Sequence, residues 1–353
     1  MGIHEKYMLR CLQLAKKGIG ATKNNPLVGS VVVHNNVIIG EGYHRKMGEA
    51  HAEVNAINSV KDQSLLKEST IYVSLEPCSH FGKTPPCAAL IASKGIGRVV
   101  VAVKDPNEDV AGRGIMMLKE TGAEVIVGIL EEKAKELNRS FFVNQTEKRS
   151  FVTLKWAQTK DGFIDNERDS RELPPLKLSN DITQCVVHKM RSQNMAIMVG
   201  TNTALKDNPT LNTRLWYGDN PVRIVLDRTG KLCADNNLFN DCAPTVVFTE
   251  LNNYPIVDNV TSIQINFEEN VVEQVLHILY EKDIATLMVE GGSMLISSFV
   301  ESDFWDEAFV EVANIEIGCG IRAPLVRGST INAKKYIDSL HYHIKKRITR
   351  NIN

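Results

Sequence analysis

Hydrophobic and polar residues alternate along the first part of the chain with two periods, that of a helix and that of a strand. Apolar side chains recur every three or four positions, the spacing of a helix face, at Tyr7, Met8, Cys11, Leu12 and Ala15. Short runs rich in Val and Ile are bounded by Gly, Asn or Ser, as is typical of strands. This pattern predicts helices at His4–Lys17, from about Ala52, at Cys87–Ser93, Gly114–Glu120 and Glu131–Phe142, and strands at Ser30–Val33, Val37–Glu41, Thr70–Ser74, Arg98–Val103 and Glu124–Gly128.

A second series of elements follows residues 144–150, a polar stretch that shows neither period. Because such a stretch has no apolar face to bury, it predicts a boundary between two domains, 1–146 and 147–353. The pattern then predicts strands at Phe151–Trp156, Ala196–Val199, Arg223–Asp227, Thr245–Thr249, Thr286–Val289 and Ala308–Ala313, and helices at about Asp181–Arg191, Val271–Glu281 and Met294–Phe299. Strands that alternate with helices in both halves favour an α/β fold class throughout.

Composition narrows the class of protein. With 41 Lys and Arg against 42 Asp and Glu, the net charge of −1 argues against binding to nucleic acid or an anionic membrane over the whole surface. The chain contains no apolar run long enough for a membrane span and begins without an apolar secretory core. Seven scattered cysteines therefore indicate a cytoplasmic, reduced protein. The basic residues of the last twenty positions favour a solvated face over an RNA-binding tail.

The strongest chemical signal is a His-x-Glu motif followed by two cysteines. His51, Cys78 and Cys87 supply one nitrogen and two sulfur ligands, a set that suits tetrahedral Zn²⁺ and leaves the fourth position for water. Glu53 is not needed as a ligand, so we expect it to carry a proton from that water to a leaving amine. This order is typical of zinc-dependent nucleobase deaminases. A structural zinc, or unrelated buried cysteines, is the alternative interpretation.

Eight residues separate the two cysteines, where the commonest deaminase motif has two. That longer loop and several other segments together resemble the bifunctional deaminase/reductase family of riboflavin biosynthesis. The segments are Asn25–Gly29, Gly42–His44, His51–Glu53, Pro77–Cys87, Asp105–Asn107 and Val110–Gly114. The resemblance covers nearly the whole first half of the chain.

For this half the resemblance implies a three-layer, cytidine-deaminase-like domain that removes the ring amine from 2,5-diamino-6-(5-phosphoribosylamino)pyrimidin-4(3H)-one. It further implies that the substrate is held by Asn25, His44, His80, Lys83, Asp105 and Asn107. A lysine ammonium suits the phosphate, and amide, imidazole and carboxylate groups suit the edge of an aminopyrimidine. Taken singly, Asn25 could instead be a turn residue before Pro26, and His44 a surface histidine.

The second half lacks the glycine fingerprints of dinucleotide-binding and P-loop folds, but Glu290-Gly291-Gly292-Ser293 joins a predicted strand to a predicted helix. Backbone N–H groups in such a turn can approach a phosphate, although a Gly-Gly turn is often only a turn. Most of residues 151–325 resemble the reductase half of the same family. The segments that carry this resemblance are Leu154-Lys155, Asp161-Gly162, Arg191, Val199–Thr203, Asp207–Leu211, Arg214 and Pro221–Asp227.

This resemblance implies a dihydrofolate-reductase-like domain that uses NADPH to reduce the ribosyl group to ribityl. Arg191 and Arg214 would clamp the substrate phosphate, while Lys155, Leu211 and Glu290 line the substrate side. The cofactor would contact Thr203, Asp207, Gly292, Ser293, Met294 and Leu295. Arg191 could instead be a surface charge, and Asp207 a turn residue. The family often has a Ser-x-Trp-Ile segment where this chain has residues 175–180, so no tryptophan can stack on a cofactor there.

The leading hypothesis is therefore a fused enzyme that catalyses zinc-assisted deamination and then NADPH-dependent reduction. The alternative is a zinc nucleic-acid base deaminase with a C-terminal RNA- or nucleotide-binding module, which a near-neutral chain with 6% aromatic residues disfavours. A third hypothesis gives the second half only a nucleotide-binding or assembly role. We expect a small-molecule substrate, no nucleic-acid or membrane partner, and a homo-oligomer.

Overall fold

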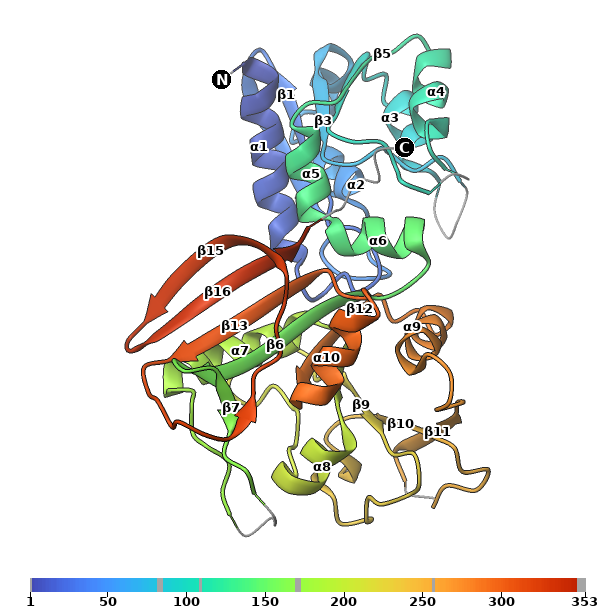
Figure 1. Cartoon of the computed structure of the whole chain (residues 1–353). Helices are drawn as coiled ribbons and strands as arrows, with labels where there is room; N and C mark the ends of the chain where they lie inside the picture. Colours follow the sequence, from blue (N-terminus) through green and yellow to red (C-terminus); the bar gives the residue numbers. More distant parts are fainter. Residues whose placement is uncertain (1, 81–84, 108–109, 169–172, 256–257, 348–353) are drawn as a thin grey trace, which may run out of the picture. The chain divides into compact units, whose positions relative to one another are not determined.

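The computed structural model describes residues 2–80, 85–107, 110–168, 173–255 and 258–347 (Figure 1). Backbone contacts divide the chain into two compact units, Met1–Lys148 and Arg149–Asn353, each with its own sheet. Within the described ranges, every helix is too short or too polar to cross a membrane.

The first unit is built on a five-stranded sheet in the order β2-β1-β3-β4-β5. Strand β1 is antiparallel to both of its neighbours, whereas β3, β4 and β5 are parallel. The strands are β1 Gly29–His34, β2 Val37–Tyr43, β3 Thr70–Val73, β4 Arg98–Val101 and β5 Glu124–Val127. The helices are α1 Ile3–Ala15, α2 Ala52–Asn58, α3 Cys87–Ser93, α4 Arg113–Glu120, α5 Glu131–Leu137 and α6 Arg139–Glu147, with 3₁₀ turns at Lys16–Gly18 and Gln63–Glu68.

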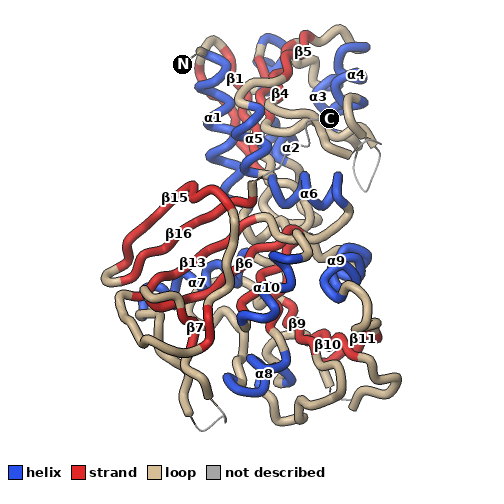
Figure 2. Tube along the Cα trace, viewed as in Figure 1, coloured by secondary structure: helices blue, strands red, loops and turns tan. Residues whose placement is uncertain are grey.

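Alternation along the strands divides the apolar core of this unit between the two faces of the sheet. On β4, Val99 and Val101 lie in the cluster that includes Ile57 of α2 and Ile91 of α3. Val100 between them lies in the other cluster, with residues of α1 and α5. Because successive strand residues point to opposite faces, both faces must be covered by helices. The expected three-layer α/β architecture is confirmed (Figure 2).

Two local details show how side chains set the element boundaries. A tight turn joins β1 to β2, in which Asn35 and Asn36 adopt φ values of 47° and 64°. The single helix predicted at Glu131–Phe142 is wrong, because the chain breaks at Asn138 between α5 and α6. The Asn138 side chain accepts the Leu27 N–H over 2.7 Å and donates to the Leu27 carbonyl over 3.0 Å. The polar stretch expected at 144–150 is helical up to Glu147.

The second unit contains a nine-stranded sheet in the order β11-β10-β9-β8-β12-β6-β13-β16-β15. It is parallel except for β16, which is antiparallel to both β13 and β15. The strands are β6 Phe151–Thr159, β8 Ala196–Val199, β9 Val222–Leu226, β10 Thr245–Thr249, β11 Val260–Gln264, β12 Thr286–Gly291, β13 Glu307–Ala313, β15 Gly328–Tyr336 and β16 Ser339–Lys346, and the pair β7 Phe163–Asp165 with β14 Ile321–Arg322 stands apart. The helices are α7 Asp181–Gln193, α8 Thr201–Asp207, α9 Val271–Glu281 and α10 Ser293–Glu301, with a 3₁₀ turn at Asn237–Phe239.

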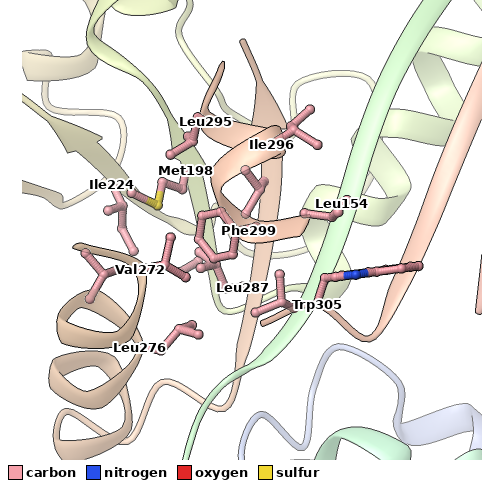
Figure 3. Close-up of a cluster of buried hydrophobic side chains, with 14 of the residues drawn as sticks. Leu154, Met198, Ile224, Val272, Leu276, Leu287, Leu295, Ile296, Phe299 and Trp305 are labelled. Carbon is pink, nitrogen blue, oxygen red and sulfur yellow. The ribbon is translucent and has the colours of Figure 1, made fainter. Parts of the chain in front are cut away.

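One face of this sheet carries the largest apolar cluster of the described chain, shown in Figure 3. Side chains of α9 and α10, among them Leu276 and Phe299, meet strand residues such as Leu154, Met198 and Leu287. Phe299 is fully buried, so its replacement by Ala should cost about 3–5 kcal/mol of stability. These helices therefore cover one face of the sheet. The polar residues of the second unit that are described below lie at its other face and at its strand ends.

Candidate active sites

The three predicted zinc ligands come together in the first unit. His51 Nδ1 lies 3.6 Å from Cys78 Sγ and 3.3 Å from Cys87 Sγ. All three ligand atoms lie within 4.8 Å of one another. A tetrahedral zinc with Zn–S near 2.3 Å and Zn–N near 2.0 Å places its nitrogen and sulfur ligands about 3.5 Å apart. The donor set and its spacing therefore fit Zn²⁺ with one coordination position left over.

Local structure explains why these side chains converge. His51 is the residue before α2, and Cys87 is the first residue of α3. The Cys87 N–H donates to Cys78 Sγ over 3.3 Å, as a free N–H at a helix start can. The Cys87 thiol and His51 hold the pKa of the Cys78 thiol down at about 4, against the effect of burial. A low thiol pKa supplies the thiolate form that a metal ligand requires.

Glu53 lies in the first turn of α2, two residues after His51, and its side chain is buried. Burial raises the pKa of Glu53 to about 7. A carboxyl group with a pKa in this range can both accept and release a proton near neutral pH. Its position beside the ligand cluster, at the wall of a cavity, suits a proton carrier.

A cavity of about 280 Å³ adjoins the cluster. Eight of the predicted deaminase residues line it, namely Asn25, His44, His51, Glu53, Cys78, His80, Asp105 and Asn107. Lys83 lies outside the described residues. The cavity therefore gathers the predicted substrate groups around the predicted metal ligands.

Asn25 and His44 form a pair at the cavity wall. The Asn25 side-chain amide lies 3.1 Å from His44 Nε2, and His44 Nδ1 lies 3.3 Å from the Ala50 carbonyl. An imidazole that donates from Nδ1 to this carbonyl accepts the amide N–H at Nε2. His44 is only 3% exposed, and burial lowers its pKa, which favours this neutral form. It is not a surface histidine.

Sequence reasoning missed the residue that anchors the part of the cavity wall around Asp105. The buried Glu76 carboxylate accepts backbone N–H groups from Asp105 at 3.2 Å, Gly112 at 3.0 Å, Gly114 at 3.0 Å and Ile115 at 3.2 Å. It thus anchors the start of α4 and the segment that carries Asp105 and Asn107. In the sequence, the position of Glu76 directly before the Pro-Cys motif was the feature that could have indicated its role.

Helix α6 also contributes to the cavity, which the sequence did not indicate. Phe141 and Gln145 line it, and Gln145 accepts a hydrogen bond from the Asn107 amide over 3.1 Å. Because residues 144–147 were predicted to be part of a linker, Gln145 was overlooked. Its periodic partner Phe141, one helical turn earlier, was the clue that the helix continued.

The second unit contains a cavity of about 800 Å³. It is lined by eight of the predicted reductase residues, namely Lys155, Thr203, Asp207, Glu290, Gly292, Ser293, Met294 and Leu295. Arg191, Leu211 and Arg214 are not among its lining residues. The segment that departs from the family pattern forms part of the wall through residues 175–179, and the Leu176 N–H donates to Asp165 over 2.9 Å.

The two predicted phosphate-clamp arginines differ in their surroundings. Arg191 binds Glu290 through two hydrogen bonds of 2.7 and 2.6 Å and donates to the Asn212 carbonyl over 3.1 Å. At 12% exposure its side chain is not a surface charge. Arg214 is exposed and donates to the Asn212 side chain over 3.0 Å. Leu211 lies in the apolar cluster beneath α8 and is buried.

Other side chains shape the predicted cofactor wall. Asp207, at the end of α8, is paired with the buried Arg168, which also bonds Asp165. An added Cβ at Gly292 would lie 3.1 Å from Thr203 Oγ1, so a larger residue would crowd that hydroxyl. Arg228, Thr229 and Lys231, which follow β9, line the same cavity and were not predicted.

Comparison with known proteins assigns each half of the chain to a known domain family. Residues 1–103 match the cytidine and deoxycytidylate deaminase zinc-binding region, and residues 150–349 match the RibD C-terminal domain. The second match reaches past residue 325, where the sequence resemblance ended. The fold and the sites thus define a fused enzyme, with a deaminase of the zinc-binding type in the first half and a reductase in the second.

The individual relatives are similar over nearly the whole chain. Riboflavin biosynthesis protein RibD of Aquifex aeolicus is 40% identical over 90% of this chain and 89% of its own. That of Bacillus amyloliquefaciens is 38% identical over 96% and 92%. The crystal structure of a diaminohydroxyphosphoribosylaminopyrimidine deaminase/5-amino-6-(5-phosphoribosylamino)uracil reductase from Thermotoga maritima matches 98% of this chain and 99% of its own, with a TM-score of 0.89 and 38% identity. The chain belongs to the RibD family of bifunctional riboflavin biosynthesis enzymes, and the nucleic-acid deaminase alternative is not favoured.

Proposed function

We propose that the first unit deaminates 2,5-diamino-6-(5-phosphoribosylamino)pyrimidin-4(3H)-one and that the second unit reduces the ribosyl group of the product to ribityl with NADPH. The observation that carries the first step is the His51, Cys78 and Cys87 cluster, with Glu53 beside it at the cavity wall. The name of the Thermotoga maritima protein, which is similar over almost the whole chain, supports both substrates.

In the deaminase, His51, Cys78 and Cys87 would hold Zn²⁺. The bound ion supplies a hydroxide nucleophile at neutral pH. Glu53 accepts a proton on its carboxylate and releases it to the departing amine, a task that suits its raised pKa. The paired Asn25 and His44 and the anchored Asp105 segment would orient the pyrimidine through hydrogen bonds.

In the reductase, the large cavity is the proposed site for both substrate and cofactor. NADPH supplies a hydride to ribose C1′. Thr203, Asp207 and the segment from Gly292 to Leu295 would contact the cofactor, since they share one wall. Lys155 and Glu290 would face the substrate, and Arg214 would bind its phosphate as a planar guanidinium. Arg191 would support that clamp through Asn212, which both arginines contact.

We further propose that the enzyme acts in the cytoplasm on this small molecule, assembles as a homo-oligomer and uses neither a nucleic-acid nor a membrane partner. Light scattering of the purified protein tests the assembly.

Replacement of Glu53 by Ala tests the deaminase proposal. The variant should keep stoichiometric zinc, because Glu53 is not a ligand, and should lose at least about 100-fold in ammonia release, as expected for a lost proton carrier. NADPH oxidation with the deaminated substrate should be unchanged, which serves as the internal control. Near-normal ammonia release by the zinc-loaded variant would refute the proton-carrier role.

A further inference from the structure

Two cations, Lys155 and Arg191, lie near Glu290 of the reductase cavity wall, and their charges must be balanced. Lys155, on β6, lines the cavity and is only partly exposed. The Arg191 side chain is 12% exposed and engages both oxygens of Glu290. An incompletely hydrated ammonium without a counter-charge tends to lose its proton. Since Glu290 is held by the guanidinium, one further carboxylate is needed to balance Lys155.

Glu311 on β13 is that carboxylate. Strands β6 and β13 are parallel neighbours in which Phe309 pairs with Lys155 and Glu311 pairs with Ala157. Residues that pair across two strands lie on the same face of a sheet, and so do residues two positions apart on one strand. Glu311 therefore lies on the same face as Lys155, as its diagonal neighbour on the adjacent strand. A diagonal step of about 7–8 Å is within reach of a long side chain. Glu311 is 1% exposed, and nothing predicted from sequence assigns it a role.

The surroundings of Glu311 keep it ionised. Ser179, from the cavity wall, donates to Glu311 Oε2 over 2.6 Å. His341 of β16 pairs with Glu311 across the sheet, and its Nε2 lies 3.6 Å from Glu311 Oε1. Burial alone would raise the pKa of Glu311, but His341, Ser179 and the charge of Lys155 outweigh it and hold the pKa at about 2. The C-terminal hairpin therefore reaches the reductase site through this carboxylate.

We propose that Glu311 is a positioning residue of the reductase, whose carboxylate serves as the counter-charge that holds Lys155 as an ammonium at the cavity wall. The role given to Lys155 rests on the proposed function. An ammonium can only donate hydrogen bonds, to a substrate oxygen for example, whereas a neutral amine would accept one. The protonation state of Lys155 thus decides which substrate group it can hold.

The charges that face Lys155 agree with this assignment. Burial lowers the pKa of Lys155, Glu290 and Glu311 both oppose that effect, and Arg191 adds to it. Removal of the Glu311 charge leaves two cations against the single carboxylate of Glu290. The pKa of Lys155 must then fall further.

Glu311→Gln tests the proposal, and Glu307→Gln is the matched control. Glu307 lies four residues earlier on the same face of β13 and also contacts a histidine of β16, His343, at 2.8 Å. On β6 it accepts a hydrogen bond from Thr153, a residue that does not line the cavity. The ¹³Cε resonance of Lys155, assigned by its loss in Lys155→Arg, is followed as a function of pH in the full chain. The midpoint of the Lys155 titration should move to lower pH by about one unit or more in Glu311→Gln and should not change in Glu307→Gln.

The pH profile of the reductase supplies a second readout. The alkaline limb of kcat/KM for NADPH oxidation should move to lower pH by the same amount in Glu311→Gln. If the Lys155 midpoint is the same in wild type and Glu311→Gln, the proposal is wrong. If the wild type shows no reductase activity at all, the proposed function fails, while the resonance still decides whether Glu311 controls the charge of Lys155.

Discussion

The carboxylate of Glu76 accepts the backbone N–H of Gly114 over 3.0 Å, and this hydrogen bond ties the metal motif to the helix start that faces it. Glu76 immediately precedes Pro77 and Cys78, so the same short segment provides a predicted zinc ligand and the anchor of the wall that carries Asp105. The proposed metal site and the proposed substrate wall are therefore held together by one segment of the chain.

Glu76→Gln should destabilise the deaminase unit and slow deamination. Glutamine retains one acceptor oxygen but brings an N–H₂ group toward backbone N–H groups, so at least one of the four hydrogen bonds, two of which are buried, is lost. Loss of hydrogen bonds to a buried charge costs about 2–3 kcal/mol, or roughly 4–10 °C of the unfolding transition. Calorimetry and an ammonia assay measure the two effects. Unchanged values of both would show that Glu76 anchors nothing.

Gly114→Ala tests the close contact beneath the same anchor. An added Cβ would lie 1.9 Å from the Pro77 carbonyl oxygen, so α4 must move away from the metal motif. Gly97→Ala is the control, because a Cβ there meets nothing within 4 Å. We expect Gly114→Ala to raise KM for the diaminopyrimidine and to lower the unfolding temperature, with zinc content kept. Equal behaviour of the two variants would contradict the contact.

Arg214→Ala is the better test of the phosphate clamp. Arg214 is exposed, so its truncation should leave stability unchanged and raise KM of the reductase about 10- to 100-fold, the loss expected for a charged hydrogen bond to phosphate. Arg191→Ala removes the partner of buried Glu290 and should also destabilise the unit, by about 3–5 kcal/mol. Steady-state kinetics with the deaminated substrate gives the answer. A KM unaffected by Arg214→Ala would remove Arg214 from the clamp.

Acid should weaken the second unit partly through Glu311. The pKa of Glu311 in the folded chain is about 2, below the ordinary value of 4.5. Its contribution to the free energy of unfolding is therefore complete above about pH 5 and disappears as the pH falls toward 2. By linkage that contribution is of order 3 kcal/mol. Thermal unfolding of wild type and Glu311→Gln is measured in half-unit steps from pH 6 down to pH 3. The difference between their unfolding temperatures should become steadily smaller as the pH falls. A difference independent of pH would contradict the low pKa.

Much of the fold could be predicted because local pattern and burial agree. Val99 and Val101 alternate with Val100 so regularly that two covered faces of the sheet were required. The errors arose where a distant partner overrode the local pattern. Asn138 interrupts a good helical sequence because its side chain pairs with the backbone of Leu27, 111 positions away. The C-terminal strands were missed because β15 is exposed over most of its length and so lacks an apolar alternation.

The site could be predicted to the extent that chemistry alone identifies a residue. His51, Cys78 and Cys87 are informative in any fold, since few other arrangements use that donor set. Glu76 and Glu311 are ordinary acids in the sequence and acquire their roles only through the groups around them. Arg191 was expected to clamp the substrate phosphate together with Arg214, and its pairing with Glu290 depends on the meeting of α7 with the end of β12.

The most direct measurement follows both reactions in one cuvette. Zinc-loaded protein receives the diaminopyrimidine ribosyl phosphate and NADPH, ammonia is assayed, and the nicotinamide absorbance is recorded. We predict ammonia release followed by NADPH oxidation, and, after removal of zinc by a chelator, loss of ammonia release with retained oxidation of NADPH when the deaminated product is supplied. Absence of ammonia release from the zinc-loaded protein would contradict the central claim.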